Sequence, residues 1–474
     1  MSDENVPPPE TPPSEGGGES GGKPTVTRRR FLGTGAALGI GVVIGAAVGA
    51  GSGYLLGSNN VKLPAGLKQG TGSFTIGTSV STSGPTAGII SKEVDMFNSL
   101  VTLVNNRGGV YAADLGGYIP LKMVVLQDGG PGDTATVKSN YNKLATQYNV
   151  DLMIGPFTAA PSEAASPVAI QNGIPYIDNQ ADEVPIFSQS GASNWVVGSL
   201  NIINYWFWNY LNVLKSQTDA KTIAFVDQGD DFDAEAAGTG TSKFGGIWMA
   251  QQLGFTVVTQ DSGVNNNFSG TFDYTPEVLK LKSLNPDVVF YCDNTAFLSA
   301  VFFQACKAQS FKPKAIHFPN GAQQAFFQQA GSLATGYSAD VYWDPSFPYQ
   351  GVFGRSTWDQ VQANASFQDQ NWPWLSIGYS CVETAVAAVQ YAGTTNKSSV
   401  MNALKTMEIT NLLGPWRAQS PIKDPFPPPS NINISGPSLS RAVPVQISNG
   451  GKRTIIGPPD LATGTYQYPE PLPW

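Results

Sequence analysis

The chain has 474 residues, of which 41% are apolar and 11% aromatic, enough for two domains that each bury a core. Charged residues make up only 13%, and 27 basic against 35 acidic side chains give a net charge of −8, which excludes a basic nucleic-acid surface. A surface that is polar through uncharged side chains suits an extracellular protein, and we hypothesise an acidic medium, in which carboxylates lose their charge at about pH 4.

The N-terminal region is predicted to be an export signal. Residues 1–26 are rich in Pro, Gly and Glu without apolar periodicity, so we expect disorder there. Arg28-Arg29, with Phe31 and Leu32 behind the pair and an uncharged, Gly-rich run after it, resembles a twin-arginine export signal. The alternative is a plain membrane anchor with basic flanks.

The signal is assigned to residues 27–57, followed by a linker over 58–72. As a helix, 33–57 would be about 37 Å long, enough to span a bilayer. The small residues Ala47 and Gly49 offer a cleavage site. The sequence therefore leaves both a cleaved signal and an uncleaved anchor open.

Strand-like and helix-like segments alternate three times between residues 74 and 178. The expected strands are 74–80, 119–127, 151–154 and 173–178, and the expected helices are 88–106, 133–148 and a segment ending at 171. This alternation predicts an α/β fold with a parallel sheet and helices on both faces. Small, polar loops after the strands predict a cleft for a small molecule at their carboxyl ends.

The same pattern starts again after Gly198. The expected strands are 222–227, 255–260, 285–291 and 314–318, the expected helices are 202–215, 233–253, 274–284 and 295–309, and a last hairpin covers 443–447 and 454–456. Five aromatic residues lie between Tyr205 and Tyr210. On a helix they point in several directions, so we expect core packing there rather than ligand contact.

An ordered series of short motifs resembles the branched-chain amino-acid type of periplasmic binding protein, the extracellular solute receptors of ABC importers. The motifs are Ser83-Gly-Pro85, Val104-Asn-Asn-Arg-Gly-Gly109, Val124-Val-Leu-Gln-Asp128, Ile154-Gly-Pro156 and Gly173-Ile-Pro175. The resemblance covers roughly residues 72–457 and weakens after Gly336. It implies two doubly wound parallel-sheet lobes joined by a three-crossing hinge that closes on a ligand.

The resemblance also implies the domain boundaries. The crossings are placed near Gly198, Gly336 and Leu413. Lobe 1 is then 73–198 plus 337–414, lobe 2 is 199–336 plus 415–457 with a Pro-rich insertion at 421–437, and 458–474 is a C-terminal tail.

The ligand-binding residues are carried over from the family position by position. They are Ser83, Thr158, Ala159, Ala181 and Asp182 in lobe 1, and Phe232, Asn294 (or its neighbour Asp293) and Asn320 in lobe 2. Loop amides at helix N-termini suit an anionic oxygen on the ligand.

The sequence departs from the amino-acid pattern at several of these positions. Asp182 stands where the family has a hydroxyl residue, Ala159 replaces a serine, Phe232 lacks a tyrosine hydroxyl, and Asn201 stands where an acidic partner for the ammonium group is expected. We therefore expect a small polar ligand such as an amino acid, an amide or a related compound. Asp182 either sets the charge preference or caps a turn.

An extracellular hydrolase and a ligand-sensing receptor on the same fold are the alternatives. Asp230, Asp231 and Asp233 form an acidic loop, which we interpret as a helix cap and a solvated turn, and the single histidine, His317, leaves no choice of partners for a catalytic triad. The three cysteines, Cys292, Cys306 and Cys381, have no metal-binding spacing and are expected to be buried thiols, with a bridge between Cys292 and Cys306 as the alternative.

These observations predict a protein that is not an enzyme and has no metal or cofactor. Its expected partners are a small-molecule ligand, an ABC permease in the membrane and the twin-arginine export machinery, with no nucleic acid. We expect it to act as a monomer on the extracellular or periplasmic side.

Overall fold

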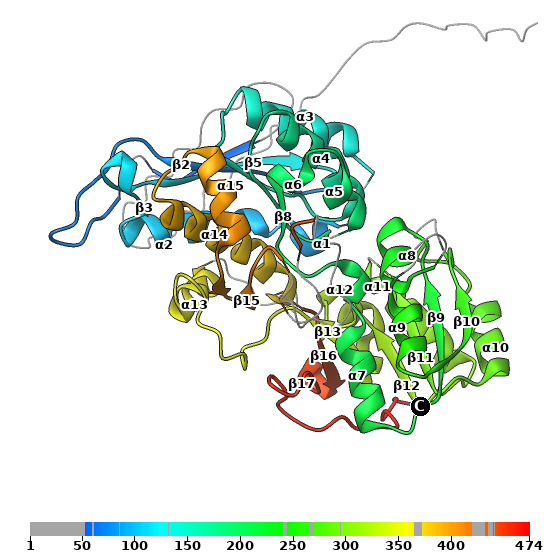
Figure 1. Cartoon of the computed structure of the whole chain (residues 1–474). Coiled ribbons are helices and arrows are strands. Elements are labelled where there is room, and N and C mark those ends of the chain that lie inside the picture. The colour runs from blue at the N-terminus through cyan, green and yellow to red at the C-terminus, as the bar shows by residue number, and fades with distance from the viewer. Residues whose placement is uncertain are drawn as a thin grey trace, which may run out of the picture. The chain divides into compact units, whose positions relative to one another are not determined.

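The chain forms two β-sheets whose strands alternate with helices, as a computed structural model shows (Figure 1). The structure describes residues 53–474 except 59–60, 85, 131, 182, 240–243, 266–268, 294, 365–371, 420–431, 435–438 and 440. The candidate signal residues Arg28, Arg29, Phe31 and Leu32, the candidate site residues Asp182 and Asn294, and most of the Pro-rich segment lie outside the described residues. The predicted α/β class is confirmed.

The first sheet has six strands in the order β1-β5-β2-β6-β7-β8. They are β1 (Gly53–Leu56), β2 (Phe74–Ser81), β5 (Leu121–Asp128), β6 (Leu152–Ile154), β7 (Tyr176–Asp178) and β8 (Val196–Gly198). Every neighbouring pair is parallel except β1 with β5. β2 is buried along almost its whole length, as expected of a parallel strand that is covered on both faces.

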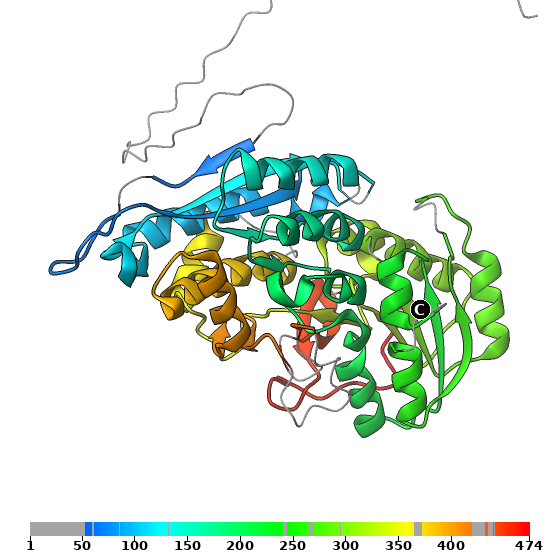
Figure 2. The ribbon, with the colours of Figure 1, turned by 45° about the horizontal axis from the view of Figure 1, so that its top comes forward.

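Helices cover both faces of this sheet. They are α1 (Ala87–Ile90), α2 (Glu93–Asn106), α3 (Thr134–Thr146), α4 (Ala159–Gln171), α5 (Val184–Ser188), α6 (Ala192–Trp195), α13 (Arg355–Asn364), α14 (Trp372–Ala392) and α15 (Lys397–Thr406). α3 packs with α4, and α2 packs with α14; the orange α15 and α14 lie across the sheet from α3 (Figure 2). Two short ribbons, β3 (Val110–Ala112) with β4 (Gly117–Ile119) and β14 (Ile409–Asn411) with β15 (Gly414–Trp416), and the 3-10 turn η1 (Ala113–Leu115) complete this part.

The turn after α2 shows why glycine is required there. Gly109 has a φ of 78°, and a Cβ at this position would lie 2.2 Å from the carbonyl oxygen of Ile119. Only glycine combines this backbone conformation with so close an approach. The turn follows directly after α2, which ends at Asn106, where the helix expected over 88–106 also ends.

The start of the described chain corrects the predicted extent of the export segment. Gly53–Leu56 forms the edge strand β1, which pairs antiparallel with β5. The helix considered over residues 33–57 is therefore wrong for Gly53–Leu56, which are a strand. Among the residues that the structure describes, no helix has both the length and the hydrophobicity needed to cross a bilayer.

The second sheet has seven strands in the order β10-β9-β11-β12-β13-β16-β17. They are β9 (Thr222–Asp227), β10 (Thr256–Asp261), β11 (Val288–Cys292), β12 (Ala315–Phe318), β13 (Tyr337–Val341), β16 (Val443–Ser448) and β17 (Lys452–Ile455). β9 to β13 are parallel, and β16 and β17 extend the sheet antiparallel, which confirms the predicted last hairpin. The three cysteines are buried thiols that form no disulfide.

The helices of this sheet correct one prediction. They are α7 (Trp208–Gln217), α8 (Asp231–Ala237), α9 (Gly246–Gln252), α10 (Thr275–Leu284), α11 (Ala296–Ala308) and α12 (Gln324–Ala330), with 3-10 turns η2 (Ile203–Tyr205), η3 (Gly331–Leu333) and η4 (Asn449–Gly451). A single helix over 233–253 is wrong, because Gly238 ends α8 in the left-handed region with a φ of 81°. The helix expected over 202–215 likewise begins only at Trp208.

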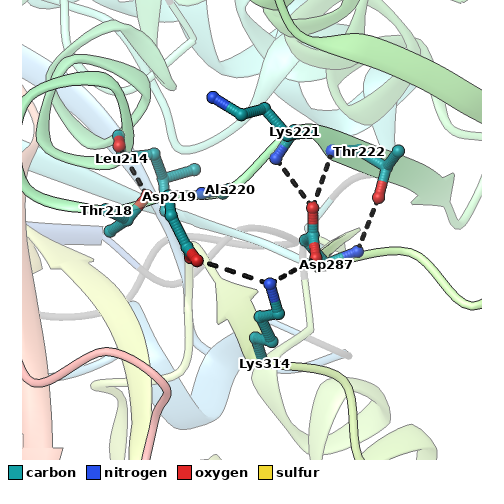
Figure 3. Close-up of polar contacts among 8 residues, drawn as sticks. All are labelled: Leu214, Thr218, Asp219, Ala220, Lys221, Thr222, Asp287 and Lys314. Carbon is teal, nitrogen blue, oxygen red and sulfur yellow. Dashed lines mark hydrogen bonds and ion pairs between the residues drawn. The ribbon is translucent and has the colours of Figure 1, made fainter.

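Polar contacts tie together the N-terminal ends of three strands of the second sheet (Figure 3). Asp287 accepts hydrogen bonds from the backbone N–H groups of Lys221 (2.7 Å) and Thr222 (3.0 Å). The ammonium group of Lys314 lies 2.9 Å from Asp287 and 3.6 Å from Asp219. These contacts hold β9, β11 and β12 in register at the edge opposite to their carboxyl ends.

The chain passes three times between the two sheets, but the second passage lies later than predicted. Tyr337–Val341 still pairs with β12 and β16 of the second sheet, so the chain leaves that sheet after Val341 and not near Gly336. The remaining lobe boundaries stay a prediction.

The expected C-terminal tail is wrong, because residues 458–474 pack against the second sheet. Tyr466, Glu470 and Leu472 are at most 5% exposed. The Tyr466 hydroxyl lies 2.8 Å from that of Tyr210, and Glu470 accepts a hydrogen bond from the backbone N–H of Ile316 at 2.7 Å. The segment is a structural part of this half of the protein.

Candidate ligand-binding site

A pocket lies where several strands end. It is lined by Phe157, Thr158, Gln180, Ala181, Leu200, Ile203, Trp206, Phe232, Asn320, Tyr342, Trp374 and Ile377. The lining follows β6, β7 and β8 of the first sheet and β12 and β13 of the second. Ligands of open α/β sheets bind beyond the carboxyl ends of the strands, so the position fits a binding site.

The structure brings four of the predicted site residues together in this lining. They are Thr158, Ala181, Phe232 and Asn320. Ala159 is buried behind them as the first residue of α4, and Ser83 is exposed; neither lines the pocket. The binding roles of all these residues stay predictions.

Thr158 places the N-terminus of α4 at the pocket. This residue has a φ of 72°, a conformation that is costly for a residue with a branched side chain. It is 4% exposed, and its hydroxyl has no hydrogen-bond partner among the described residues. The first turn of α4 also leaves the amides of Ala159 and Ala160 without intrahelical acceptors, so this corner suits an anionic group.

Gln180 belongs to a network of buried polar side chains next to the pocket. Glu93 accepts hydrogen bonds from the amide groups of Gln180 and Asn179, each at 3.4 Å, and the thiol of Cys381 contacts the amide oxygen of Asn179 at 3.6 Å. Burial raises the pKa of Glu93 from 4.5 to about 8, so its carboxyl group is protonated in the folded protein at neutral pH. The side-chain oxygen of Gln180 has no described partner.

Aromatic rings form most of the remaining wall. Trp206 meets Phe232 edge to face, with ring centroids 5.1 Å apart, and Phe157, Tyr342 and Trp374 also line the pocket. Trp206 is 2% exposed and its indole N–H has no described hydrogen-bond partner. Trp206 packs against Phe207 and Phe232, as expected for this aromatic cluster, and it also lines the pocket. Phe207 and Tyr210 pack in the core.

Asn320 connects loops rather than offering free polar atoms. Its amide group donates to the carbonyl oxygen of Asp293, and its oxygen accepts from Gln323 at 2.8 Å. Asp293 itself is buried and accepts two hydrogen bonds from Ser299. Burial is the largest effect and raises the pKa of Asp293 well above its usual value. The hydrogen bonds from Ser299 act in the opposite direction but do not cancel it.

The groups that suggested an enzyme have structural roles. Asp230 caps α8 by accepting a hydrogen bond from the backbone N–H of Asp233 at 2.8 Å, as the sequence predicted. His317 lies between Ser338 (3.2 Å) and Asp340 (3.0 Å), but all three are at most 1% exposed. The His317 ring stacks on the Tyr210 ring, and all three residues are buried in the core away from solvent.

Sequence reasoning missed most of the lining. Gln180 and Trp206 stood in segments that the sequence had marked, the loop after β7 and the aromatic cluster. Tyr342, Trp374 and Ile377 follow Gly336, where the motifs fade, and nothing in their spacing distinguishes them from core residues.

Comparison with known proteins agrees with this architecture. A model of the periplasmic binding protein family matches residues 73–422. The chain is similar to the branched-chain amino acid transporter substrate-binding protein LivJ of Streptococcus pneumoniae in complex with isoleucine, with 16% identity and a TM-score of 0.61 over 81% of this chain and 98% of that one.

Two further structures show the same fold. The leucine-binding protein LivK of Thermotoga maritima has 15% identity and a TM-score of 0.61 over 81% of this chain and 97% of its own. A solute-binding protein of an ABC transporter from Rhodopseudomonas palustris, in complex with 4-hydroxybenzoate, has 14% identity and a TM-score of 0.56 over 81% and 95%.

Proposed function

The chain belongs to the periplasmic binding protein family, of the type that includes the branched-chain amino acid receptors, and on that premise we propose that it captures a small solute and delivers it to an ABC permease. Family membership implies a solute-binding role on the extracellular or periplasmic side. The observation that carries the proposal is the pocket at the strand ends, where buried polar groups of Thr158, Gln180 and Trp206 have no hydrogen-bond partner among the described residues.

We propose that the ligand is held by closure of the two halves around it. The lining comes from loops of both sheets, so each half alone supplies part of the contacts. A ligand that contacts both halves binds the closed form more tightly and shifts the population towards it. Delivery then follows when the permease opens the protein.

Ligand binding is expected to raise the melting temperature and to compact the protein. A solute at 100 times its Kd stabilises the folded state by about 2.7 kcal/mol. A thermal-shift screen of amino acids, amides and carboxylic acids identifies binders, and small-angle scattering with and without a binder measures the compaction. If no small solute in these classes shifts the melting temperature, the proposed function is wrong.

We further propose export through the twin-arginine route. Replacing both Arg28 and Arg29 with lysine keeps the charge but removes the arginine pair, and we expect the precursor to accumulate inside the cell. Immunoblotting of cell fractions measures this, with Lys23→Arg as a control outside the pair. Normal export of the double variant argues for the plain membrane anchor instead.

A further inference from the structure

We infer that Glu183, at a contact between the two halves beside the pocket, is a proton-binding site, so that closure of the protein takes up a proton and is favoured in an acidic medium. The inference rests on the proposed function, since it concerns the closure by which a solute is held. The ligand of this site is the proton itself, and its test therefore needs no solute.

A hydrogen bond joins the two halves at this point. The carboxyl group of Glu235, on α8 of the second half, accepts it from the backbone N–H of Val184, the first residue of α5 in the first half, at 3.1 Å. Ala181 and Phe232 each lie three positions before one of these residues, and both line the pocket. A solute that draws the halves together therefore also closes this contact.

Glu183 lies directly beside this hydrogen bond, at the start of α5. The residue is 1% exposed, and one of its carboxyl oxygens has no hydrogen-bond partner among the described residues. Burying an ionised carboxylate without full compensation is costly, because the charge loses its hydration. A protonated carboxyl group avoids most of that cost, so the closed contact favours the form that holds the proton.

Four further carboxyl groups act on the charge of Glu183. Asp178 at the end of β7 and Glu163 on α4 belong to the first half, whereas Asp230 and Glu235, at the start of α8 and on it, belong to the second. α6 also packs against α5 but has no titratable side chain. Burial is the largest effect, and together with the four negative charges it raises the pKa of Glu183 from 4.5 to about 10.

The direction of the pH effect follows from the state that holds the proton. Opening moves Glu183 away from Asp230 and Glu235 and admits water, so its pKa falls back towards 4.5. Between these two pKa values the closed form keeps the proton and the open form releases it. The preference for closure is therefore complete below the open-form pKa of about 4.5 and is lost as the pH rises through about 10.

Fluorescence energy transfer in the full chain without solute measures the closure. One dye is attached at Thr146→Cys, at the end of α3 in the first half, and one at Ser283→Cys, in α10 of the second half; both positions are exposed, whereas the native cysteines are buried. Between about pH 8.5 and about pH 5.5 we expect the ratio of closed to open protein to rise about tenfold for each pH unit of acidification, the slope for one linked proton. A transfer efficiency that does not change with pH overturns the inference.

Three variants assign the response to one carboxyl group. Glu183→Gln imitates the protonated form and is expected to hold the acid value of the parent at every pH. Glu235→Gln keeps an acceptor for the N–H of Val184 but removes a charge, so its value at about pH 8.5 is expected to move towards the acid value. The matched control is Glu470→Gln, another buried carboxyl group whose hydrogen bonds lie within the second half, and it is expected to respond to pH as the parent does.

The outcome for Glu183→Gln decides the assignment. If this variant still responds to pH as the parent does, the inference is overturned, because the proton is then bound elsewhere. The proposed function is judged separately, since a solute that raises the melting temperature supports it whether or not closure depends on pH. If no solute raises the melting temperature but the transfer efficiency follows pH as described, the proton site stands and the proposed function fails.

Discussion

Between pH 8 and pH 4.5 the free energy of unfolding is expected to rise by on the order of 5 kcal/mol. Glu93, Glu383 and Glu470 are at most 3% exposed, and burial raises the pKa of each from 4.5 to about 8. One pKa unit corresponds to about 1.36 kcal/mol, so even one such group gives an effect of this size. Most proteins respond to acid in the opposite way.

The sign follows from which state holds the proton. Between about pH 4.5 and 8 the folded protein keeps these carboxyl groups protonated, whereas the unfolded chain has released the protons. The stabilisation is therefore complete below the unfolded pKa of about 4.5 and is lost as the pH rises through about 8. This agrees with the low charge content of the sequence, which suggested an acidic medium.

Denaturant unfolding at several pH values measures the effect, and single variants assign it. Glu470→Gln imitates the protonated carboxyl group, so we expect a shallower pH dependence and an unfolding free energy at pH 8 at least equal to that of the parent. The control is Glu408→Gln, whose side chain is 68% exposed and lies 2.7 Å from Arg417. Stability that falls on acidification from pH 7 to pH 4.5 contradicts the prediction.

The regular elements were predictable because their signals are local. The strand over residues 222–227 was placed with its bounds correct, since an apolar, β-branched run between turn residues needs no partner to be recognised. The second passage between the sheets was placed near Gly336, which has a φ of 78° and suits a turn. The sheet to which residues 337–341 belong is decided instead by pairing with β12 and β16. The residues next to this strand in the sequence give no signal of that pairing.

Residues of the candidate site could be predicted only where they follow strands that the sequence pattern itself predicts. Thr158 and Ala181 come directly after strands that the apolar pattern marks, and the pocket contains both. The role of Gln180 depends on Glu93, which lies 87 positions away and has no signal in the sequence. Trp206 was assigned to packing because periodicity alone does not show that an aromatic residue also lines a pocket.

Replacing Tyr466 with alanine is expected to cost about 3–5 kcal/mol of stability, as for a large buried aromatic residue. The residue belongs to the segment first taken for a tail, yet it is 5% exposed. Its hydroxyl lies 2.8 Å from the Tyr210 hydroxyl and donates a hydrogen bond to the carboxyl group of Glu470 at 3.0 Å. The substitution opens a cavity and also leaves both partners, which are themselves buried, with an unmade hydrogen bond.

The neighbouring residue supplies the control. Thr465 is exposed and makes no described side-chain hydrogen bond, so Thr465→Ala is expected to change the unfolding free energy by less than about 0.5 kcal/mol. Both are measured by urea unfolding at pH 6, and Tyr466→Phe separates the hydroxyl from the ring. If Tyr466→Ala and Thr465→Ala are equally mild, the segment contributes no stability and behaves as the tail that its composition suggested. If only Tyr466→Ala is severe, residues 458–474 are part of the folding unit, because Tyr466 contacts Tyr210 of α7 and Glu470, and Glu470 in turn accepts a hydrogen bond from Ile316 of β12.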